Sequence, residues 1–299
     1  MNPPPFPVPR PVVTGATGFV GARVAALFGA PVTVRLGPPG WREAVAALDL
    51  AGATVIHLAA RVHAPGATEA AFDADNVTKT AVRAEAAADA GAARFVFAST
   101  VKVFGEESGA RPFSEAAAAD PRDAYARSKW RAEQALEGIS RASGLPVVVL
   151  RIPFTYGPGA GGNFRALARL ADTGWWLPLG GIANRRSVLQ VDDLARAIVT
   201  AAGAPGIDGR TYAIAHGEPL STTRLVEAMR RALGRPRRLV AVPPALLEAA
   251  GALAGQGERV RRLTRSLEVD PAAFSRDTGW VARVGLEDGV AGALRGAAA

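Results

Sequence analysis

The sequence contains no cysteine and very little histidine, tyrosine or lysine. Its 299 residues include 3 His and 3 Tyr, and lysine occurs only at positions 79, 102 and 129. The absence of cysteine excludes disulfide bonds, thiolate zinc sites and cysteine nucleophiles. Because His57 stands inside an apolar segment, we interpret it as a packed side chain and expect no metal ion in the protein.

Long apolar segments are also missing. A membrane-spanning helix needs about 18 or more consecutive apolar residues, and the apolar stretch at 246–254 is too short. No signal peptide is recognisable, and the proline-rich residues 1–11 are expected to form a loose tail. We therefore expect a cytoplasmic protein with no membrane partner.

Positive charge comes almost entirely from arginine. The chain has 35 Lys and Arg against 27 Asp and Glu, a net charge of +8. The arginine clusters are interleaved with Ala, Leu and Pro rather than with aromatic residues that stack on bases, and no nucleic-acid-binding motif is present. We interpret the charge as a solvated surface and expect no nucleic-acid partner.

Short apolar segments alternate with segments of helical periodicity. Strands are expected around Val12, Val32, Val55, Phe95 and Val147, and helices over 19–29, 77–91, 123–142 and 191–203. This alternation predicts an α/β fold built on a doubly wound parallel sheet.

A glycine-rich turn follows the first expected strand. Gly15, Gly18 and Gly21 lie between the apolar Val12-Val13 and a helical segment. This spacing allows a tight turn, close approach of a pyrophosphate to the backbone and close packing of the helix on the sheet. Since the chain has 33 glycines, the spacing alone occurs easily. The strand-turn-helix context carries the prediction of a dinucleotide cofactor, with its phosphates at the helix N-terminus.

Tyr125 and Lys129 form a Tyr-x-x-x-Lys pair in a chain that hardly uses either residue. Helical residues four apart share one face, so both side chains are expected in one site. A nearby ammonium favours ionisation of the phenol, whose ordinary pKa is about 10. The pair therefore predicts a tyrosine that moves protons at neutral pH. The alternative, an ordinary Tyr and Lys on a surface helix, is weakened by the glycine turn upstream.

The end of the second expected strand indicates the type of cofactor. An acidic residue there binds the ribose hydroxyls of NAD, and a basic one neutralises the 2′-phosphate of NADP. Arg35 occupies this position, with Arg23 or Arg42 as possible helpers, and no acidic residue follows until Glu43. Arg35 favours NADP(H) over NAD(H), with an unrelated surface role for this arginine as the alternative.

Together these motifs resemble the extended short-chain dehydrogenase/reductase family, in its NAD-dependent epimerase/dehydratase branch that acts on nucleotide sugars. The resemblance runs nearly end to end, through segments 14–21, 55–60, 76–80, 95–105, 125–133, 151–159 and 184–194. Segments 100–106, 125–133 and 184–187 are similar to those of a subgroup that includes UDP-sugar 4-epimerases and reductases of UDP-4-keto-6-deoxy-N-acetylhexosamines.

The resemblance implies a Rossmann domain for the cofactor and a smaller C-terminal α/β domain for the substrate. The first would comprise residues 1–162 with about 185–215, and the second about 163–184 and 216–299. Relatives commonly dimerise through the helices equivalent to 77–91 and 123–142, so a homodimer is expected.

The resemblance also implies residue roles. Catalysis falls to Thr100, Tyr125 and Lys129. The cofactor would be bound by Gly15, Thr17, Gly18, Phe19, Val20, Gly21, Arg35, Leu58, Ala59, Ala60, Ser99, Tyr125, Lys129 and Pro153. The substrate would be bound by Thr100, Asn163, Arg186 and Arg262, with Arg186 the better match to a diphosphate-binding arginine, whose planar fork suits phosphate.

The implied reaction is hydride exchange at C4 of a nucleotide sugar, by reduction of a 4-keto group or by epimerisation. Tyr125 would donate or accept the proton, Thr100 would hydrogen-bond the sugar oxygen, and the same groups serve both reactions. A non-catalytic, NAD(P)-sensing protein on the same fold is the alternative, although it would not need Thr100, Tyr125 and Lys129 together.

One segment departs from the family pattern. Only about sixteen residues separate the second strand from the strand at 54–58, whereas relatives fit a helix, a strand and another helix there, and one βαβ unit takes about 30 residues. We expect the strand that carries an adenine-contacting Asp to be lost or shortened, with Asp49 a poor substitute.

Overall fold

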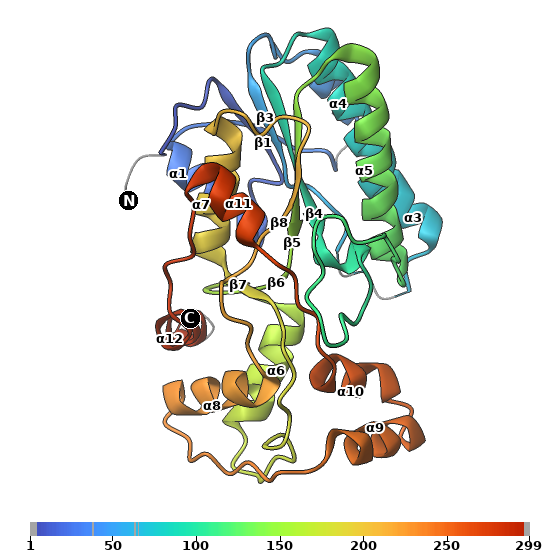
Figure 1. Cartoon of the computed structure of the whole chain (residues 1–299). Helices are drawn as coiled ribbons and strands as arrows, with labels where there is room; N and C mark the ends of the chain where they lie inside the picture. The colour runs from blue at the N-terminus through green and yellow to red at the C-terminus, as the bar shows by residue number, and fades with distance from the viewer. Residues whose placement is uncertain (1–4, 38, 63, 65, 296–299) are drawn as a thin grey trace.

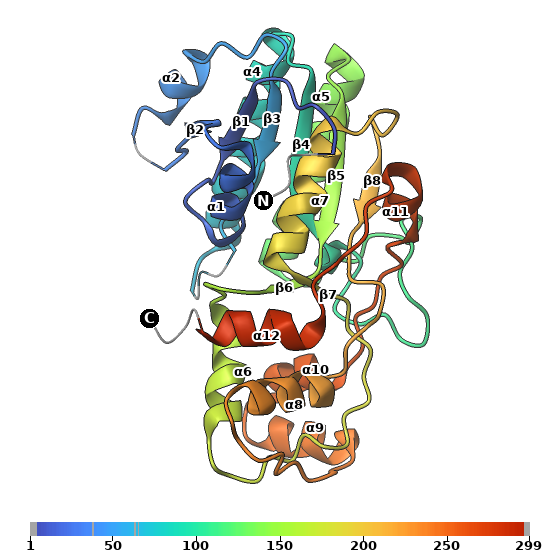
Figure 2. The ribbon, with the colours of Figure 1, turned by 90° about the vertical axis from the view of Figure 1, so that its left-hand side faces the viewer.

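The computed structural model describes residues 5–37, 39–62, 64 and 66–295. Its larger part is a parallel sheet in the order β2-β1-β3-β4-β5-β8, with helices on both faces (Figures 1 and 2). The strands are β1 (Pro11–Thr14), β2 (Val32–Val34), β3 (Thr54–His57), β4 (Arg94–Thr100), β5 (Val147–Ile152) and β8 (Thr211–Ala213). The predicted doubly wound parallel sheet is confirmed.

The helices are α1 (Phe19–Phe28), α2 (Trp41–Ala46), α3 (Glu69–Asp73), α4 (Lys79–Asp89), α5 (Ala124–Ser143), α6 (Gly162–Asp172), α7 (Val191–Gly203), α8 (Thr222–Ala232), α9 (Pro244–Leu253), α10 (Gly257–Thr264), α11 (Ala272–Thr278) and α12 (Leu286–Arg295). The four predicted helical ranges correspond to α1, α4, α5 and α7, and the remaining helices were not predicted individually. A π-helical turn (Ala74–Thr78) precedes α4, and a 3₁₀ turn (Val101–Val103) follows β4. Within the described ranges, every helix is too short or too polar to cross a bilayer.

Successive residues of the central strands enter two different cores. Val13 and Val96 pack with α1 and α7 on one face, whereas Val12 and Phe95 pack with α4 and α5 on the other. A parallel sheet covered on both faces needs such continuous apolar strands. Small residues on the covering helices, such as Ala132, let α5 lie close to the sheet.

Among the described residues of the short segment between β2 and β3, α2 is the only helix, and there is no strand. Trp41, Val45 and Leu50 pack into the core beneath α4 and α5, and so cover the edge of the sheet in place of a longer excursion. The predicted shortening is confirmed. Asp49 instead forms an exposed ion pair with Arg10 at 2.7 Å.

A second unit lies beyond the carboxyl ends of the strands (Figure 2). It comprises α6, α8, α9, α10 and α12, next to the two-stranded sheet of β6 (Phe154–Tyr156) and β7 (Val188–Gln190). Its core contains Phe164, Met229 and Val290. The predicted division assigns most of 216–299 to this unit, and within that range Phe274 and Trp280 pack in the core beneath α1 and α7.

The prediction of a loose N-terminal tail is wrong for the described part of residues 1–11. Phe6 and Val8 pack against the core beneath α1 and α7, and the Pro7 carbonyl lies against Gly203 at the end of α7. The apolar side chains between the prolines cover the helix end, which the proline content alone did not indicate. Residues 1–4 lie outside the described residues.

Candidate active site

The glycine turn has the geometry that its sequence predicts. Gly15 has a φ of 73°, which favours glycine, and its carbonyl accepts a hydrogen bond from the Gly18 N–H at 2.9 Å. A Cβ atom on Gly21 would lie 2.0 Å from that carbonyl oxygen. The third glycine therefore lets α1 pack directly against the turn.

The N-terminus of α1 is suited to bind phosphate. No side chain caps it, and no acidic residue stands in its first turn. Thr17 and Gly18 are exposed, and Phe19 and Val20 are half-buried. The free N–H groups and the helix dipole favour an anion at this end. The turn thus fits the pyrophosphate of a dinucleotide.

Leu58, Ala59 and Ala60 leave β3 beside this turn. The Leu58 N–H donates to the Thr14 carbonyl at 3.3 Å, and a Cβ atom on Gly15 would lie 2.7 Å from the Ala59 nitrogen. All three residues are half-buried, and Pro153, which follows β5, is buried. The predicted cofactor segments from β1 and β3 therefore lie side by side.

Arg35 is exposed immediately after β2. Its two predicted helpers are engaged elsewhere: Arg23 pairs with Asp192 at 3.6 Å, and Arg42 lies over the Trp41 ring at 4.8 Å. Of the three arginines, Arg35 is therefore the one whose exposed side chain is available to a ligand at the edge of the sheet.

His57 is buried and forms part of a hydrogen-bonded chain. The Thr80 hydroxyl donates to the Asn76 carbonyl at 2.6 Å, so it accepts from His57 Nε2 at 3.1 Å. On the other side, the Thr14 hydroxyl donates to His57 Nδ1 at 3.0 Å and accepts from the Ala59 N–H. This network assigns one neutral tautomer to the ring.

Burial also holds His57 neutral. Loss of hydration lowers its pKa to about 3, and the charges of Lys129 and Arg83 act in the same direction. The ring stacks on Phe95 and Phe97. The prediction that His57 is a packed side chain is confirmed.

Thr100 and Tyr125 come together from β4 and α5. Thr100 is the last residue of β4, and Tyr125 lies in the first turn of α5, whose N-cap Asp123 accepts from the Ala126 N–H at 2.7 Å. Burial and the Asp123 charge raise the pKa of Tyr125, while a hydrogen bond from the Thr100 side chain acts against them. The phenol and the hydroxyl therefore share one site.

Lys129 is buried one turn further along α5. Its Nζ lies 3.9 Å from the centre of the Phe97 ring, and burial lowers its pKa to about 7 against the opposing charge of Glu133. The expected lowering of the Tyr125 pKa by Lys129 is absent, because the ammonium faces Phe97 and burial dominates both groups.

Asn76 and Ser128 are positioning groups that sequence reasoning left without a role. The buried Asn76 accepts from the Arg61 N–H at 2.8 Å and donates to Ser128 Oγ at 2.9 Å. Ser128 in turn donates to the Tyr125 carbonyl at 2.8 Å. The π-helical turn before α4 is thereby tied to the start of α5. Asn76 lies in segment 76–80, which is one of the segments that carry the family resemblance, so the sequence did indicate that this region matters.

Ser99 does not offer a free hydroxyl to a cofactor. Its Oγ donates to the buried Glu133 carboxylate, which is also bound by Arg151. Its predicted cofactor contact would have to come from other atoms of the residue.

Of the four substrate candidates, Thr100 ends β4, and the other three lie on the second unit or at its edge. Asn163 is exposed in the first turn of α6, whose N-terminus has no side-chain cap. Arg186 donates to the Arg265 carbonyl at 3.0 Å; burial lowers its pKa, the charge of Glu106 opposes this, and the charge of Arg262 adds to it. The charge of Arg262 also acts on Asp123, the N-cap of the helix that carries Tyr125. Two adjacent guanidinium groups favour a bound anion.

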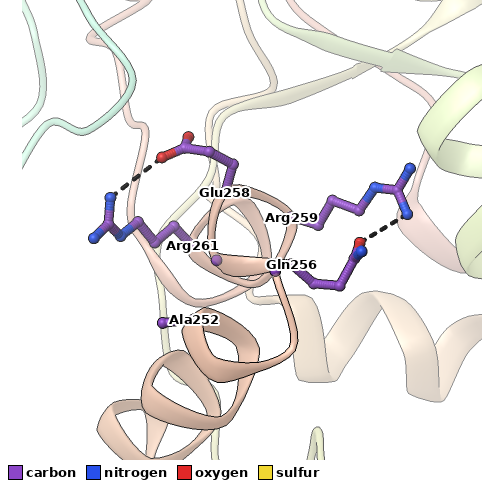
Figure 3. Close-up of a pocket in the computed structure, with 7 residues that line it drawn as sticks. Ala252, Gln256, Glu258, Arg259 and Arg261 are labelled. Carbon is purple, nitrogen blue, oxygen red and sulfur yellow. Dashed lines mark hydrogen bonds and ion pairs between the residues drawn. The ribbon is translucent and has the colours of Figure 1, made fainter.

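Two hollows in the structure lie apart from these groups. One, of about 500 Å³, is at the turn between α9 and α10, where Arg261 pairs with Glu258 and Arg259 with Gln256 (Figure 3). Another, of about 260 Å³, lies between segments 112–114, 216–219 and 268–271. Neither is lined by Thr100, Tyr125 or Lys129.

Comparison with known families decides the assignment. The model of the NAD dependent epimerase/dehydratase family matches residues 41–215, more than half of the chain. The chain belongs to this family. The matched range begins after the glycine turn, so the evidence for the turn comes from its own geometry.

Similar proteins agree with the family. The chain is 34% identical over 241 residues to the UDP-glucose 4-epimerase of Vibrio cholerae, covering 79% of this chain and 74% of that one. In fold it is similar to the UDP-glucose 4-epimerase of Thermotoga maritima with UDP-glucose (TM-score 0.76, 22% identity, 96% of this chain and 98% of that one). It is equally similar to RMD from Pseudomonas aeruginosa complexed with NADPH (TM-score 0.75, 22% identity, 96% and 98%).

Proposed function

We propose that this protein is an NAD(P)-dependent oxidoreductase acting at C4 of a nucleotide-activated sugar, with Tyr125 as the acid/base. One observation carries the proposal: Thr100, at the end of β4, lies close enough to the half-buried Tyr125 to lower the pKa of its phenol, and Lys129 lies one helical turn away. A purely structural role would not require these groups together next to a phosphate-binding turn.

Tyr125 moves the proton of the sugar oxygen at the reacting carbon. Thr100 holds that oxygen by a hydrogen bond, so the proton passes along a fixed direction. The chemistry that a nicotinamide bound here would supply is transfer of hydride to or from this carbon. Lys129 would bind the ribose hydroxyls of the cofactor, and contact with them would favour its ammonium form.

Arg186 and Arg262 would hold the diphosphate of the substrate, with Asn163 at the uncapped start of α6 beside them. Binding energy from this remote group fixes the sugar against Thr100 and Tyr125. The positive charge of the two arginines, one of which lowers the pKa of the other, supports this assignment.

Two reactions use these groups. In epimerisation Tyr125 first removes the proton of the 4-hydroxyl and later returns it, whereas in reduction it only protonates a 4-keto oxygen. The 34% identity to a UDP-glucose 4-epimerase favours epimerisation. Arg35 supports NADP(H), which suits a reductase, while the family description names NAD.

The test is to denature purified protein, identify any released nicotinamide nucleotide by mass spectrometry, and assay UDP-hexoses and 4-keto-6-deoxy derivatives. Retained NAD with interconversion of UDP-glucose and UDP-galactose establishes the epimerase. An empty protein that oxidises NADPH only with a 4-keto sugar establishes the reductase. No reaction with either class, in protein that binds the cofactor, contradicts the proposal.

A further inference from the structure

A second buried polar cluster lies on α5, one turn beyond Lys129. Its centre is Glu133, which is 6% exposed. Ser99 Oγ donates to Glu133 Oε1, and Arg151 Nη2 donates to Oε2 at 2.7 Å. Ser99 and Arg151 are directly paired residues of β4 and β5. The carboxylate therefore ties α5 to both central strands at one level.

The arginine of this cluster is itself held in place. The Arg151 guanidinium lies 4.5 Å from the Phe104 ring centre and 5.7 Å from that of Trp130. Its Nε atom lies 3.2 Å from each oxygen of Glu133. With both oxygens occupied, Glu133 has no free position for proton transfer to a substrate.

The cluster is adjacent in sequence to the proposed catalytic groups. Ser99 precedes Thr100 on β4, and Glu133 follows Lys129 by four residues on α5. If α5 slid along the sheet, the Glu133 contacts would break, and the same movement would separate Thr100 from Tyr125. Displacements of about 1 Å in such a site reduce turnover by roughly 100-fold.

Glu133 also provides the negative charge that acts on Lys129. On the neighbouring elements, Lys129 and Arg83 of α4 both act on His57 of β3, Arg151 of β5 bonds Glu133, and the charge of Asp123 acts on Tyr125. His57 is neutral, and both arginines are positive. Glu133 is therefore the anion that counters burial at Lys129.

We propose that Glu133 is a positioning residue, held by Ser99 and Arg151, that fixes α5 in register against β4 and β5 and places a negative charge one helical turn from Lys129. The kinetic part of this inference rests on the proposed function. The electrostatic part does not, because it can be measured on the lysine itself.

The chain offers a direct measurement, since it contains only three lysines. NMR of protein labelled at the lysine Cε and Nζ atoms gives at most three titrating signals, and Lys129→Met identifies the one from Lys129. The variants are Glu133→Gln and Arg151→Met, with Glu137→Gln as the matched control. Glu137 lies on the same helix but pairs at the surface with Arg141 at 2.5 Å.

We expect opposite effects on Lys129. Glu133→Gln removes the anion and moves the titration midpoint down by about one pH unit, while Arg151→Met leaves the carboxylate uncompensated and moves it up. Glu137→Gln leaves it unchanged. If Glu133 served stability alone, the Lys129 titration midpoint would change in neither variant, or would move in the same direction in both. Either result, in variants that still show a melting transition, overturns the proposal.

Turnover provides the second readout. For Glu133→Gln we expect kcat to fall about 10- to 100-fold with KM for the nucleotide sugar nearly unchanged, since the diphosphate anchor is untouched. If Glu133→Gln does not fold, Ser99→Ala removes one hydrogen bond and keeps both charges, and a fall in kcat without a change in KM is expected there. Unchanged kcat in a folded variant overturns the positioning role. Absence of turnover in the wild type contradicts only the proposed function, because the NMR titration remains decisive here.

Discussion

The Nε2 atom of His57 lies 3.1 Å from the Thr80 hydroxyl, which is itself committed as a donor to the Asn76 carbonyl. The imidazole therefore joins β3 to the segment that leads into α4. On its other side it joins β3 to the end of β1 through Thr14. One buried neutral ring thus links the glycine turn to the elements that support Tyr125.

This linkage predicts a pH dependence of stability. The pKa of His57 is about 3 in the folded protein against 6.5 ordinarily, so below pH 6.5 the unfolded state binds the proton more readily. Stability is therefore lost as the pH falls from 6.5 towards 3, by up to about 1.4 kcal/mol per pH unit from this group. Urea unfolding of His57→Gln should show a flatter dependence between pH 6.5 and 4.5. Identical slopes for variant and wild type would contradict it.

Arg83 is predicted to destabilise the fold. Its side chain is fully buried, and Nε, Nη1 and Nη2 have no hydrogen-bond partner among the described residues. Arg83→Met should stabilise the protein by about 1–4 kcal/mol, because an uncompensated buried charge is removed. Calorimetric melting should show a higher Tm.

The matched control for Arg83 is Arg94, which is also buried but fully partnered. It bonds Asp208 at 2.7 Å and the carbonyls of Ala201 and Ala204 at 2.9 and 2.8 Å. Arg94→Met should cost about 1–3 kcal/mol by leaving these acceptors unpaired. A lower Tm for both variants would show that Arg83 has a partner after all.

Gly21 is predicted to be essential for cofactor binding. In Gly21→Ala the new methyl group would lie 2.0 Å from the Gly15 carbonyl oxygen, so the turn must move. We expect affinity for NAD(P)H, measured by calorimetry, to fall at least about 10-fold, or 1.4 kcal/mol. Gly138→Ala on α5, where no atom lies within 4 Å, is the control and should bind normally. Normal binding by Gly21→Ala would place the phosphates elsewhere.

Arg35 is predicted to set the cofactor preference. Replacement Arg35→Asp removes the cation at the end of β2 and introduces an acceptor for ribose hydroxyls. The ratio of the Kd values for NADH and NADPH should fall by about 10-fold or more. Arg42→Asp, at an arginine stacked on Trp41, is the control and should leave the ratio nearly unchanged. A ratio insensitive to Arg35 would make it an ordinary surface residue.

Local sequence patterns predicted five of the six strands of the larger sheet and four of the helices. The strands, the glycine turn and the Tyr125–Lys129 pair depend on periodicity and on short spacings, which a single sequence displays. The loss of the strand that relatives have between β2 and β3 was also predicted, because too few residues separate these two strands. The meeting of Thr100 with Tyr125 came from the family resemblance, and the structure brings both groups together.

Contacts between distant segments could not be predicted in this way. Ser99 meets Glu133 only because β4 and α5 pack together, and Phe6 is partly buried only because α7 ends beside it. The protonation of Lys129 depends on burial beneath Phe97 and on Glu133, neither of which a Tyr-x-x-x-Lys spacing contains. Packing and desolvation decide these properties, and they appear only in three dimensions.

The most direct test of the account is the absorbance of the reduced nicotinamide ring after cofactor-loaded protein is mixed with a UDP-hexose or its 4-keto derivative. Wild type and Tyr125→Phe are compared at equal bound nucleotide, checked by mass spectrometry after denaturation. The account predicts a change in wild type that is at least about 100-fold slower in Tyr125→Phe, since the proton has no donor or acceptor. Equal rates in the two proteins would contradict the assignment of Tyr125 as the acid/base.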